Sequence, residues 1–464
     1  MVSRPKSDRQ WRGPGVALAA ILALAAGLRV PGLEYGLPFG NLLNPDEQSI
    51  VPRAWRMVHG GGLDPGWFDY PTAVMYLLAP WQAWHSVPSY LTARVVILLF
   101  GVAAVAAAWW LGRHAYGVGA AVVAAAAVAV DATHIAYSRM AVTDIPLTLF
   151  VAAALALMIS GRLEWSGVAV GLAAGAKYPG VFLLAPLLVA GWGRWRRVAV
   201  AAGLAAAVFL ATNPFVAVHP AAAADDALRV QRRARDGWLG FEHDHWTPIA
   251  FLDRLWEGLG PTLVVAGAGL VLALVRRTRS DLVLASFTLV YFASLVPLEA
   301  HFDRYVLPLV PVLGALAGRL RPLAPVALAL LVVPLVWSLE DDVRLTRTDT
   351  RVVAHRWIET ALPNGARVAV DPSIAPLDDV SVLPLALPGP AFRSDPNRDV
   401  SRLRAAGVEY AVVTGAIADR VLAARDRYLR EARFYDRLRT STKRLYYVSS
   451  GRGLTGPWVA VYRL

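Results

Sequence analysis

The chain has 464 residues, of which 56% are hydrophobic and only 17% are charged, and its formal net charge is +12. Because soluble domains carry roughly 25% charged residues, this composition predicts a membrane protein. The basic residues form short clusters between apolar runs instead of one stripe, so we expect no nucleic-acid partner. With no cysteine in the sequence, disulfides, thiol catalysis and cysteine-ligated zinc are excluded.

The first apolar run extends from about residue 16 to 30 and follows a basic start at Arg4, Lys6, Arg9 and Arg12. A secretory signal peptide has this pattern, but many apolar runs follow, so we interpret the first run as a membrane anchor. Membrane lipids are therefore expected around most of the chain. Further runs of spanning or near-spanning length lie near residues 92–111, 116–133, 145–160, 197–213, 261–275, 282–297, 304–319 and 322–338.

The apolar stretch 166–192 is too long for one span, and the arginine clusters around it indicate how many spans it contains. Clusters at 194–197, 276–279 and 319–321 should be cytoplasmic, and only two spans within 166–192 permit this. We predict two short helices, 166–176 and 180–192, that meet at Lys177-Tyr178-Pro179, because proline ends a helix. Irregular backbone at membrane depth is tolerated only where it lines a cavity or water. The result is a polytopic α-helical protein with about eleven transmembrane helices and the C-terminus outside.

From Glu340 the composition changes abruptly to that of a soluble domain. We therefore divide the chain into a transmembrane catalytic domain, 1–338, and a small extracytoplasmic α/β domain, 339–464. In this second domain the pattern predicts strands at 367–370, 410–413 and 458–462 and one helix at 416–434.

The first outer loop, from about 32 to 91, contains Asn44-Pro45-Asp46-Glu47. Its apolar stretch 71–84 is too short to span easily and is expected to lie in the interface or re-enter. Adjacent carboxylates near the membrane surface suit proton abstraction. Capping of the helix after Pro45 by Asp46 and Glu47 is the alternative, and spacing alone slightly favours it.

The second outer turn carries Asp131, His134, Arg139 and Asp144 at the mouth of the helix bundle. For Asp131 and His134 we favour an interfacial, structural role, and Asp144 is placed to cap the helix that it begins. Arg139 and Asp144 either pair with each other or orient a substrate.

Lys177 is one of three lysines and the one that lies within an apolar segment. A charge there costs about 2.5 to 3.5 kcal/mol unless it is compensated. A lipid phosphate or pyrophosphate would compensate it, because lysine binds phosphate as a point charge. The alternative is that the side chain extends to the interface.

Two further polar groups occupy the outer side. Arg304 precedes a proline-containing span and could bind a departing phosphate, or pair with Asp303 or Glu299. In the third outer loop, 214–260, His243 and His245 flank an aspartate, but in an extended strand they would point to opposite faces. We therefore predict no metal site there, and acceptor binding with Trp246 stacked on a sugar is equally open. Whether a divalent cation joins Asp46 is also open.

Five short motifs, in chain order and on one side of the membrane, resemble those of a known family. The chain resembles the GT-C glycosyltransferases of the protein O-mannosyltransferase and aminoarabinose-transferase type, glycosyltransferase family 39. The motifs cover most of residues 13–338 and are Pro45-Asp46-Glu47, Ser138-Arg139 with Asp144-Ile145-Pro146, Gly171 to Gly180 with Lys177-Tyr178-Pro179, Thr212-Asn213-Pro214-Phe215, and Arg304-Tyr305 through Pro311.

The resemblance implies a GT-C fold and an inverting transfer of a sugar from a polyprenyl-phosphate donor to an acceptor hydroxyl on a glycan, lipid or protein. It assigns Asp46 as the general base, with Glu47 as a second catalytic candidate. Lys177 and Arg304 would neutralise the phosphate, and Asp144 would position the acceptor or sugar. The remaining substrate-binding candidates are Arg139, Tyr178, Tyr305, His243 and His245.

The orientation given by the arginine clusters places the active site and the C-terminal domain outside the cytoplasmic membrane. The chain lacks the large inserted domain of the protein O-mannosyltransferases, which argues against a protein acceptor. A lipid or sugar transporter, or flippase, is the main alternative because intramembrane charges often mark a transport path. Transporters are commonly built from repeated halves, whereas the charges here gather on one side. A non-catalytic assembly or sensor protein is a third interpretation.

Overall fold

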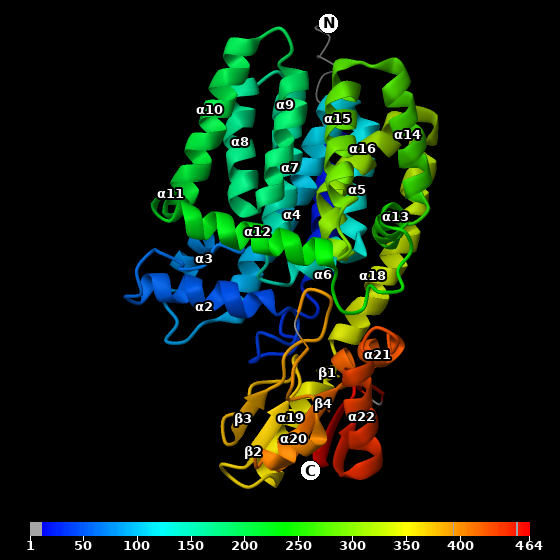
Figure 1. Cartoon of the computed structure of the whole chain (residues 1–464). Coiled ribbons are helices and arrows are strands. Elements are labelled where there is room, and N and C mark those ends of the chain that lie inside the picture. The colour runs from blue at the N-terminus through cyan, green and yellow to red at the C-terminus, as the bar shows by residue number, and fades with distance from the viewer. Residues whose placement is uncertain (1–11, 393, 452) are drawn as a thin grey trace, which may run out of the picture.

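The computed structural model describes residues 12–392, 394–451 and 453–464, arranged as a tall helical bundle above a smaller α/β unit (Figure 1). Arg4, Lys6 and Arg9 of the predicted basic start lie outside the described residues. The helices before the α/β unit are α1 (Arg12–Arg29), α2 (Asp46–Val58), α3 (Ala73–Gln82), α4 (Tyr90–Ala115), α5 (Val118–Val130), α6 (Ala132–Ser138), α7 (Asp144–Ile159), α8 (Leu163–Ala176), η1 (Tyr178–Leu183), α9 (Leu184–Ala190), α10 (Trp195–Thr212), α11 (Pro214–Val218), α12 (Pro220–Asp236), α13 (Thr247–Leu259), α14 (Thr262–Arg276), α15 (Arg279–Leu295), η2 (Asp303–Leu309), α16 (Val310–Arg319), η3 (Arg321–Leu323), α17 (Ala324–Leu330) and α18 (Val332–Leu345).

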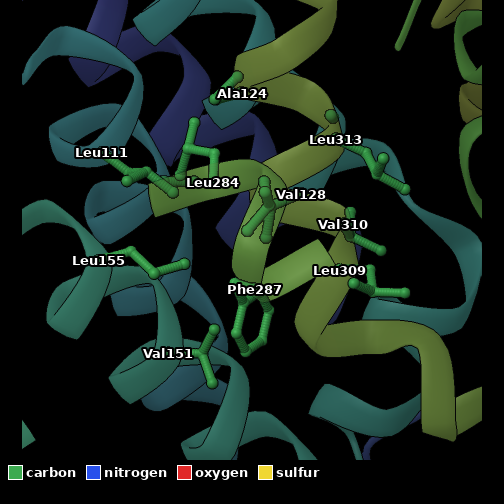
Figure 2. Packing of buried hydrophobic residues seen from close by; sticks show 14 of the residues in the cluster. Leu111, Ala124, Val128, Val151, Leu155, Leu284, Phe287, Leu309, Val310 and Leu313 are labelled. Atoms are coloured by element: carbon green, nitrogen blue, oxygen red, sulfur yellow. The ribbon is translucent and has the colours of Figure 1, made fainter. Parts of the chain in front are cut away.

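The bundle packs around α4, α5, α7, α15, η2 and α16, which contribute the buried leucine, valine and phenylalanine side chains labelled in Figure 2. Small residues allow the central helices to approach closely. A Cβ on Gly314 of α16 would lie 2.9 Å from the Cα of Ala124 in α5, and one on Gly318 would lie 2.4 Å from the Cα of Ala120. Such small-residue contacts are typical of helix packing in membranes.

One end of the bundle gathers the predicted cytoplasmic arginines. Arg279 donates to the carbonyls of Met158 and Ala190, which end α7 and α9, at 3.3 and 3.2 Å. Arg319 pairs with Asp281 at 2.6 Å. Three exposed tryptophans, Trp165, Trp192 and Trp195, lie at the same turns. Arginines with an aromatic belt are what the cytoplasmic interface of a membrane protein carries.

The opposite end has its own exposed tryptophans, among them Trp81 in α3 and Trp256 in α13. There α2, α3 and α12 lie across the end of the bundle instead of along it (Figure 1). The predicted interfacial stretch 71–84 corresponds to α3, and it packs against α2 through Val74, Met75 and Leu78. A layer of short amphipathic helices at this end is consistent with a membrane surface.

The predicted apolar runs coincide with helices or broken helices, but fewer of the described helices than predicted are long and apolar enough to count as membrane spans. Among the described residues, three helices are long and apolar enough to cross a membrane by length and composition: Tyr90–Ala115, Trp195–Thr212 and Arg321–Leu345. Two bent pairs, α5 with α6 at 59° and α13 with α14 at 116°, would bring the number to five. The count of about eleven spans stays a prediction.

The predicted break within 166–192 is confirmed. Helix α8 ends at Ala176, Lys177 is extended with φ −154° and ψ 136°, and the chain continues as η1 and then α9. Gly180 closes this turn tightly, because a Cβ there would lie 2.3 Å from the backbone of Ala173 and Ala174. The break holds the Lys177 backbone outside both helices.

The α/β unit contains β1 (Thr348–Asp349), α19 (Thr350–Ala361), β2 (Arg367–Val370), β3 (Ser381–Pro384), α20 (Val400–Ala405), β4 (Tyr410–Thr414), α21 (Gly415–Ala423), α22 (Leu429–Ser441), β5 (Lys443–Val448), β6 (Leu454–Thr455) and β7 (Val459–Arg463). Its five-stranded sheet has the order β3-β2-β4-β7-β5, with β2 parallel to β3 and β4, and β7 antiparallel to its neighbours. The three predicted strands are confirmed within one residue. The single predicted helix 416–434 is wrong, because the chain leaves the helix after Ala423 and re-enters one at Leu429.

Helices cover both faces of the five-stranded sheet, and the apolar side chains of its central strands alternate between these faces. Val368 and Val412 face α19, whereas Ala369 and Ala411 face α21 and α22. Successive side chains of a strand point to opposite faces, so a strand buried on both sides is apolar throughout.

The α/β unit is attached to the outer loops of the bundle. Arg351 of α19 donates to the carbonyl of Leu42 at 2.6 Å, and Asn41 donates to that of Ile374 at 2.7 Å. On the other flank, the Tyr428 hydroxyl donates to Glu242 of the third outer loop at 2.5 Å. That contact lies within the interruption between α21 and α22, and a tertiary bond there is one reason why a single helix does not form.

Candidate active site

Asp46 is the first residue of α2, at the end of the bundle opposite the arginine clusters. Its Oδ2 accepts hydrogen bonds from the Tyr70 hydroxyl at 2.9 Å and from the Arg304 guanidinium. Pro45 is the N-cap residue of α2, and Asn44 Oδ1 accepts from the Asp46 amide at 2.9 Å, so Asp46 and Glu47 do not act as the caps that spacing favoured. The Asp46 side chain is 22% exposed and can be reached from outside.

The surroundings of Asp46 keep it ionised. Burial raises the pKa of the Asp46 carboxyl, but Arg304, Tyr70 and Lys177 outweigh burial and hold that pKa below its usual value. Burial also raises the pKa of Tyr70, so its phenol stays protonated and donates to the carboxylate. Asp46 is thus a partly exposed carboxylate with a fixed orientation.

Lys177 and Asp144 form an ion pair beside this carboxylate. The Lys177 Nζ lies 2.5 Å from Asp144 Oδ1, and both residues are buried. The same ammonium lies 5.6 Å from the centre of the Tyr70 ring and 5.2 Å from that of Tyr305. Tyr70 therefore lies between Asp46 and Lys177. Lys177, at the break after α8, thus lies at the same site as Asp46 of the first outer loop.

Arg304 begins the broken span formed by η2 and α16. Its backbone amide bonds to Asp303 Oδ1 at 2.8 Å, and the Tyr137 hydroxyl holds the same carboxylate oxygen at 2.8 Å. The guanidinium pairs with Asp46, so the alternative of an ion pair with Asp303 or Glu299 is wrong. The Arg304 Nε is buried without a hydrogen-bond partner among the described residues, which leaves one donor free for a ligand.

Glu47 is held in a different way from its neighbour. Arg94 of α4 binds both of its oxygens, at 2.9 and 2.7 Å, and the Ala141 amide binds one of them at 2.8 Å. Both side chains are 0% exposed. A carboxylate that accepts three hydrogen bonds and has no access from outside cannot be reached by a substrate hydroxyl. We assign Glu47 to fixing the first loop against α4 and the turn before α7, rather than to catalysis.

The pairing expected between Arg139 and Asp144 is also wrong. Arg139 is 1% exposed and pairs with Asp342 of α18, while Asp144 pairs with Lys177. Arg139 therefore connects the second outer turn to α18 and does not face the substrate side. The neighbouring Asp131 caps α6 by accepting from the His134 amide at 2.7 Å, which agrees with the structural role that we favoured.

Tyr178 and Asn213 support the site from behind. The Tyr178 hydroxyl donates to the carbonyl of Phe68 at 2.9 Å, and Asn213 Oδ1 accepts from the Thr72 amide at 2.5 Å. Both contacts fix the segment that carries Tyr70. Sequence analysis did not single out Tyr70, although its position just before Pro71 in the first loop was a usable signal.

His243 and His245 lie on the exposed part of the third outer loop. The His243 Nε2 is 3.3 Å from the carbonyl of Ala423, so this residue contacts the α/β unit. Within the described part of the chain, no group of three or more histidine, aspartate or glutamate side chains is arranged to hold a metal ion. Their substrate-binding role stays a prediction.

Comparison with known proteins identifies the family. The family model of glycosyltransferase family 87 matches residues 67–298, half of the chain. The chain belongs to this glycosyltransferase family. No curated protein sequence matches this glycosyltransferase.

Solved structures share its fold at low sequence identity. ArnT from Cupriavidus metallidurans, bound to undecaprenyl phosphate, has 15% identity and a TM-score of 0.55, with 98% of each chain covered. The oligosaccharyltransferase AglB from Archaeoglobus fulgidus, in complex with an inhibitory peptide and a dolichol-phosphate, has 12% identity and a TM-score of 0.58 over 96% of this chain and 74% of that one. The predicted GT-C membership is confirmed, and the protein is a multi-pass membrane glycosyltransferase.

Proposed function

We propose that this glycosyltransferase transfers a sugar from a polyprenyl-phosphate donor to an acceptor hydroxyl outside the cytoplasmic membrane, with inversion at the anomeric carbon. The observation that supports it most directly is the Asp46 carboxylate, which is accessible and ionised, pairs with Arg304, and is separated from the Lys177 ammonium by the Tyr70 ring. A base and a phosphate site side by side are what a single displacement needs.

Asp46 acts as the base in this proposal. Its Oδ1, which accepts no hydrogen bond from the described residues, takes the proton of the acceptor hydroxyl as the acceptor oxygen attacks the anomeric carbon. The bond between that carbon and the phosphate oxygen breaks, and the polyprenyl phosphate leaves with the bonding electron pair. Because attack and departure occur on opposite faces of the sugar, the configuration inverts.

Arg304 has two successive partners. In the free protein it binds Asp46 Oδ2, and its positive charge makes the carboxylate a weaker base. A phosphate offers the guanidinium a bidentate partner of greater charge, so donor binding would draw Arg304 from the carboxylate. Tyr70 keeps Asp46 oriented through this exchange. Asp46 thus becomes a stronger base when a donor is present.

Lys177 provides the second charge, and its pairing with Asp144 compensates its burial before the donor binds. The polyprenyl phosphates bound to the structurally similar enzymes support a lipid donor, and the arginine-rich opposite end supports an extracytoplasmic site. The α/β unit, residues 339–464 in our division, lies at the same end of the bundle as α2, the helix that Asp46 begins (Figure 1). Glycan, lipid and protein hydroxyls all fit this chemistry.

The test is sugar transfer in reconstituted vesicles by Asp46→Asn, with Asp225→Asn on the exposed part of α12 as the matched control. Asparagine keeps the shape of the residue and cannot accept the proton, so we expect a loss of at least about a hundredfold, typical of a missing general base. The control should retain full activity. Full activity of Asp46→Asn with an unchanged melting temperature would remove Asp46 as the base.

A further inference from the structure

A cavity of about 340 Å³ lies along α2, in the loop that supplies Asp46 but away from the phosphate site. Two arginines on α2, Arg53 and Arg56, line it together with the following glycine-rich turn. It is large enough for a charged group with part of a sugar ring, and it opens to the outside.

The arginines of this cavity have no acidic partner among the described residues. Arg53 donates from Nη1 to the carbonyl of Ser49 at 2.8 Å, while its Nε is buried and unpartnered. Desolvation and the neighbouring Arg56 lower the pKa of Arg53, and the opposing effect of Asp69, which pairs with Arg229, is smaller. By contrast, the nearby Arg229 pairs with both Asp69 and Asp226. An anion in the cavity would relieve the repulsion between Arg53 and Arg56.

One carboxylate also lines the cavity, and it is already engaged. Asp64 Oδ2 lies 2.9 Å from His219 Nε2, and its Oδ1 accepts from the Gly66 amide at 2.9 Å. Its charge is therefore directed to these partners rather than to Arg53 or Arg56.

Continuous contacts connect the cavity with the base. The Arg53 guanidinium lies 4.5 Å from the centre of the Trp67 ring, and Trp67 meets Tyr70 edge-on with the ring centres 5.6 Å apart. Tyr70 in turn donates to Asp46. Along α2, Arg53 follows Asp46 by seven residues, which corresponds to about 10 Å and nearly the same helix face. Trp67 supplies an aromatic surface between the two ends, of the kind on which a sugar stacks.

We infer that this cavity is an acceptor subsite, and that the acceptor carries a phosphate or carboxylate one or two sugar units from the hydroxyl that Asp46 deprotonates. The inference rests on the proposed function and specifies its acceptor as an anionic glycan or glycolipid. The donor phosphate belongs to Arg304 and Lys177, so the two anions have separate sites.

Binding is tested with the full-length protein in phosphatidylcholine nanodiscs and with glycerol 1-phosphate as the probe. Hydrogen exchange of residues 53–66 should slow with the probe and not with glycerol. Because each charged hydrogen bond contributes enough for about a tenfold change, the variant Arg53→Gln/Arg56→Gln should bind at least about tenfold more weakly. The control Arg232→Gln/Arg235→Gln removes the same charge from exposed positions of α12 and should bind normally. Equal protection by glycerol, or an unaffected Arg53/Arg56 variant, would overturn the inference.

Two further experiments distinguish a bulk lipid headgroup from an anionic group on the acceptor. If phosphatidylglycerol in the nanodiscs protects residues 53–66 while glycerol 1-phosphate does not, the cavity serves a bulk lipid headgroup and the acceptor role is overturned. In transfer assays with envelope extracts, labelled product should bind an anion-exchange resin, and the Arg53/Arg56 variant should raise KM for acceptor with kcat retained. If the labelled sugar is found only in uncharged product, the inference that the acceptor is anionic is also overturned.

Failure of the proposed function would look different. Wild-type protein would then transfer no sugar from any polyprenyl-phosphate donor, whatever the cavity binds. Asp46→Asn should abolish transfer while leaving the response of residues 53–66 to glycerol 1-phosphate intact. The two ideas therefore fail on different measurements.

Discussion

Arg304 gives the sharpest test of the mechanism, because its two roles have separate readouts. Arg304→Gln removes a donor aimed at the leaving phosphate. Losing one preorganised donor to a developing charge costs about a hundred- to a thousandfold in rate. The Arg304 and Asp46 side chains are 11% and 22% exposed, so water screens the site partly and we expect the lower end, about a hundredfold. Arg304→Lys keeps the charge without the planar fork and should lose less.

The second readout is the pH profile of kcat/KM. Asp46 must be ionised to act as base, so activity falls as the pH drops through its pKa. In the wild type Arg304 helps hold that pKa below its usual value, and the acid limb should lie below about pH 4. Without Arg304, burial is opposed only by Tyr70 and Lys177, so the pKa and the acid limb should move to higher pH.

The assay measures transfer of labelled sugar in vesicles across the pH range, with Arg344→Gln as the control. Arg344 is on α18 and its side chain is 64% exposed, so its loss should change neither the rate nor the limb. Arg304→Gln with a wild-type rate and an unmoved acid limb would refute both the contact with phosphate and the control of Asp46.

Two predictions concern the buried pairs around the site. Glu47→Gln leaves Arg94 buried without its counter-charge, which should lower the free energy of unfolding by about 3 to 5 kcal/mol, and Glu47→Leu/Arg94→Met should recover much of it in denaturation experiments. If Glu47→Gln kept the stability and lost only kcat, Glu47 would return as a catalytic residue. Lys177→Met/Asp144→Asn removes both charges of the second pair, so folding should survive while KM for the donor rises about tenfold or more, because a charged contact to phosphate is lost. A donor KM within a factor of about two of the wild type, measured from initial rates, would exclude Lys177 from the phosphate site.

Some of the long-range organisation could be predicted because local chemistry dictates it. Pro179 after Lys177 predicts where a helix breaks, since proline cannot continue one, and α8 ends at Ala176. Strand β2 coincides with the predicted stretch Arg367–Val370, because a short apolar run between polar turns favours a buried strand. Asp46, Lys177 and Arg304 were placed on one side of the membrane by the arginines at the other end, and they lie together.

The sequence by itself determined which segments are apolar, where they break and which end carries the charge, because these depend on composition and on backbone constraints within a few residues. Tertiary structure alone decided the partners. Asp46 meets Arg304 across 258 positions, and Arg139 meets Asp342 across 203 instead of its near neighbour Asp144. At such separations many pairings satisfy the same charges, and helix packing selects among them. Asp46 and Glu47 are adjacent in sequence, yet one faces the open site and the other is locked to Arg94, because successive helix residues point about 100° apart.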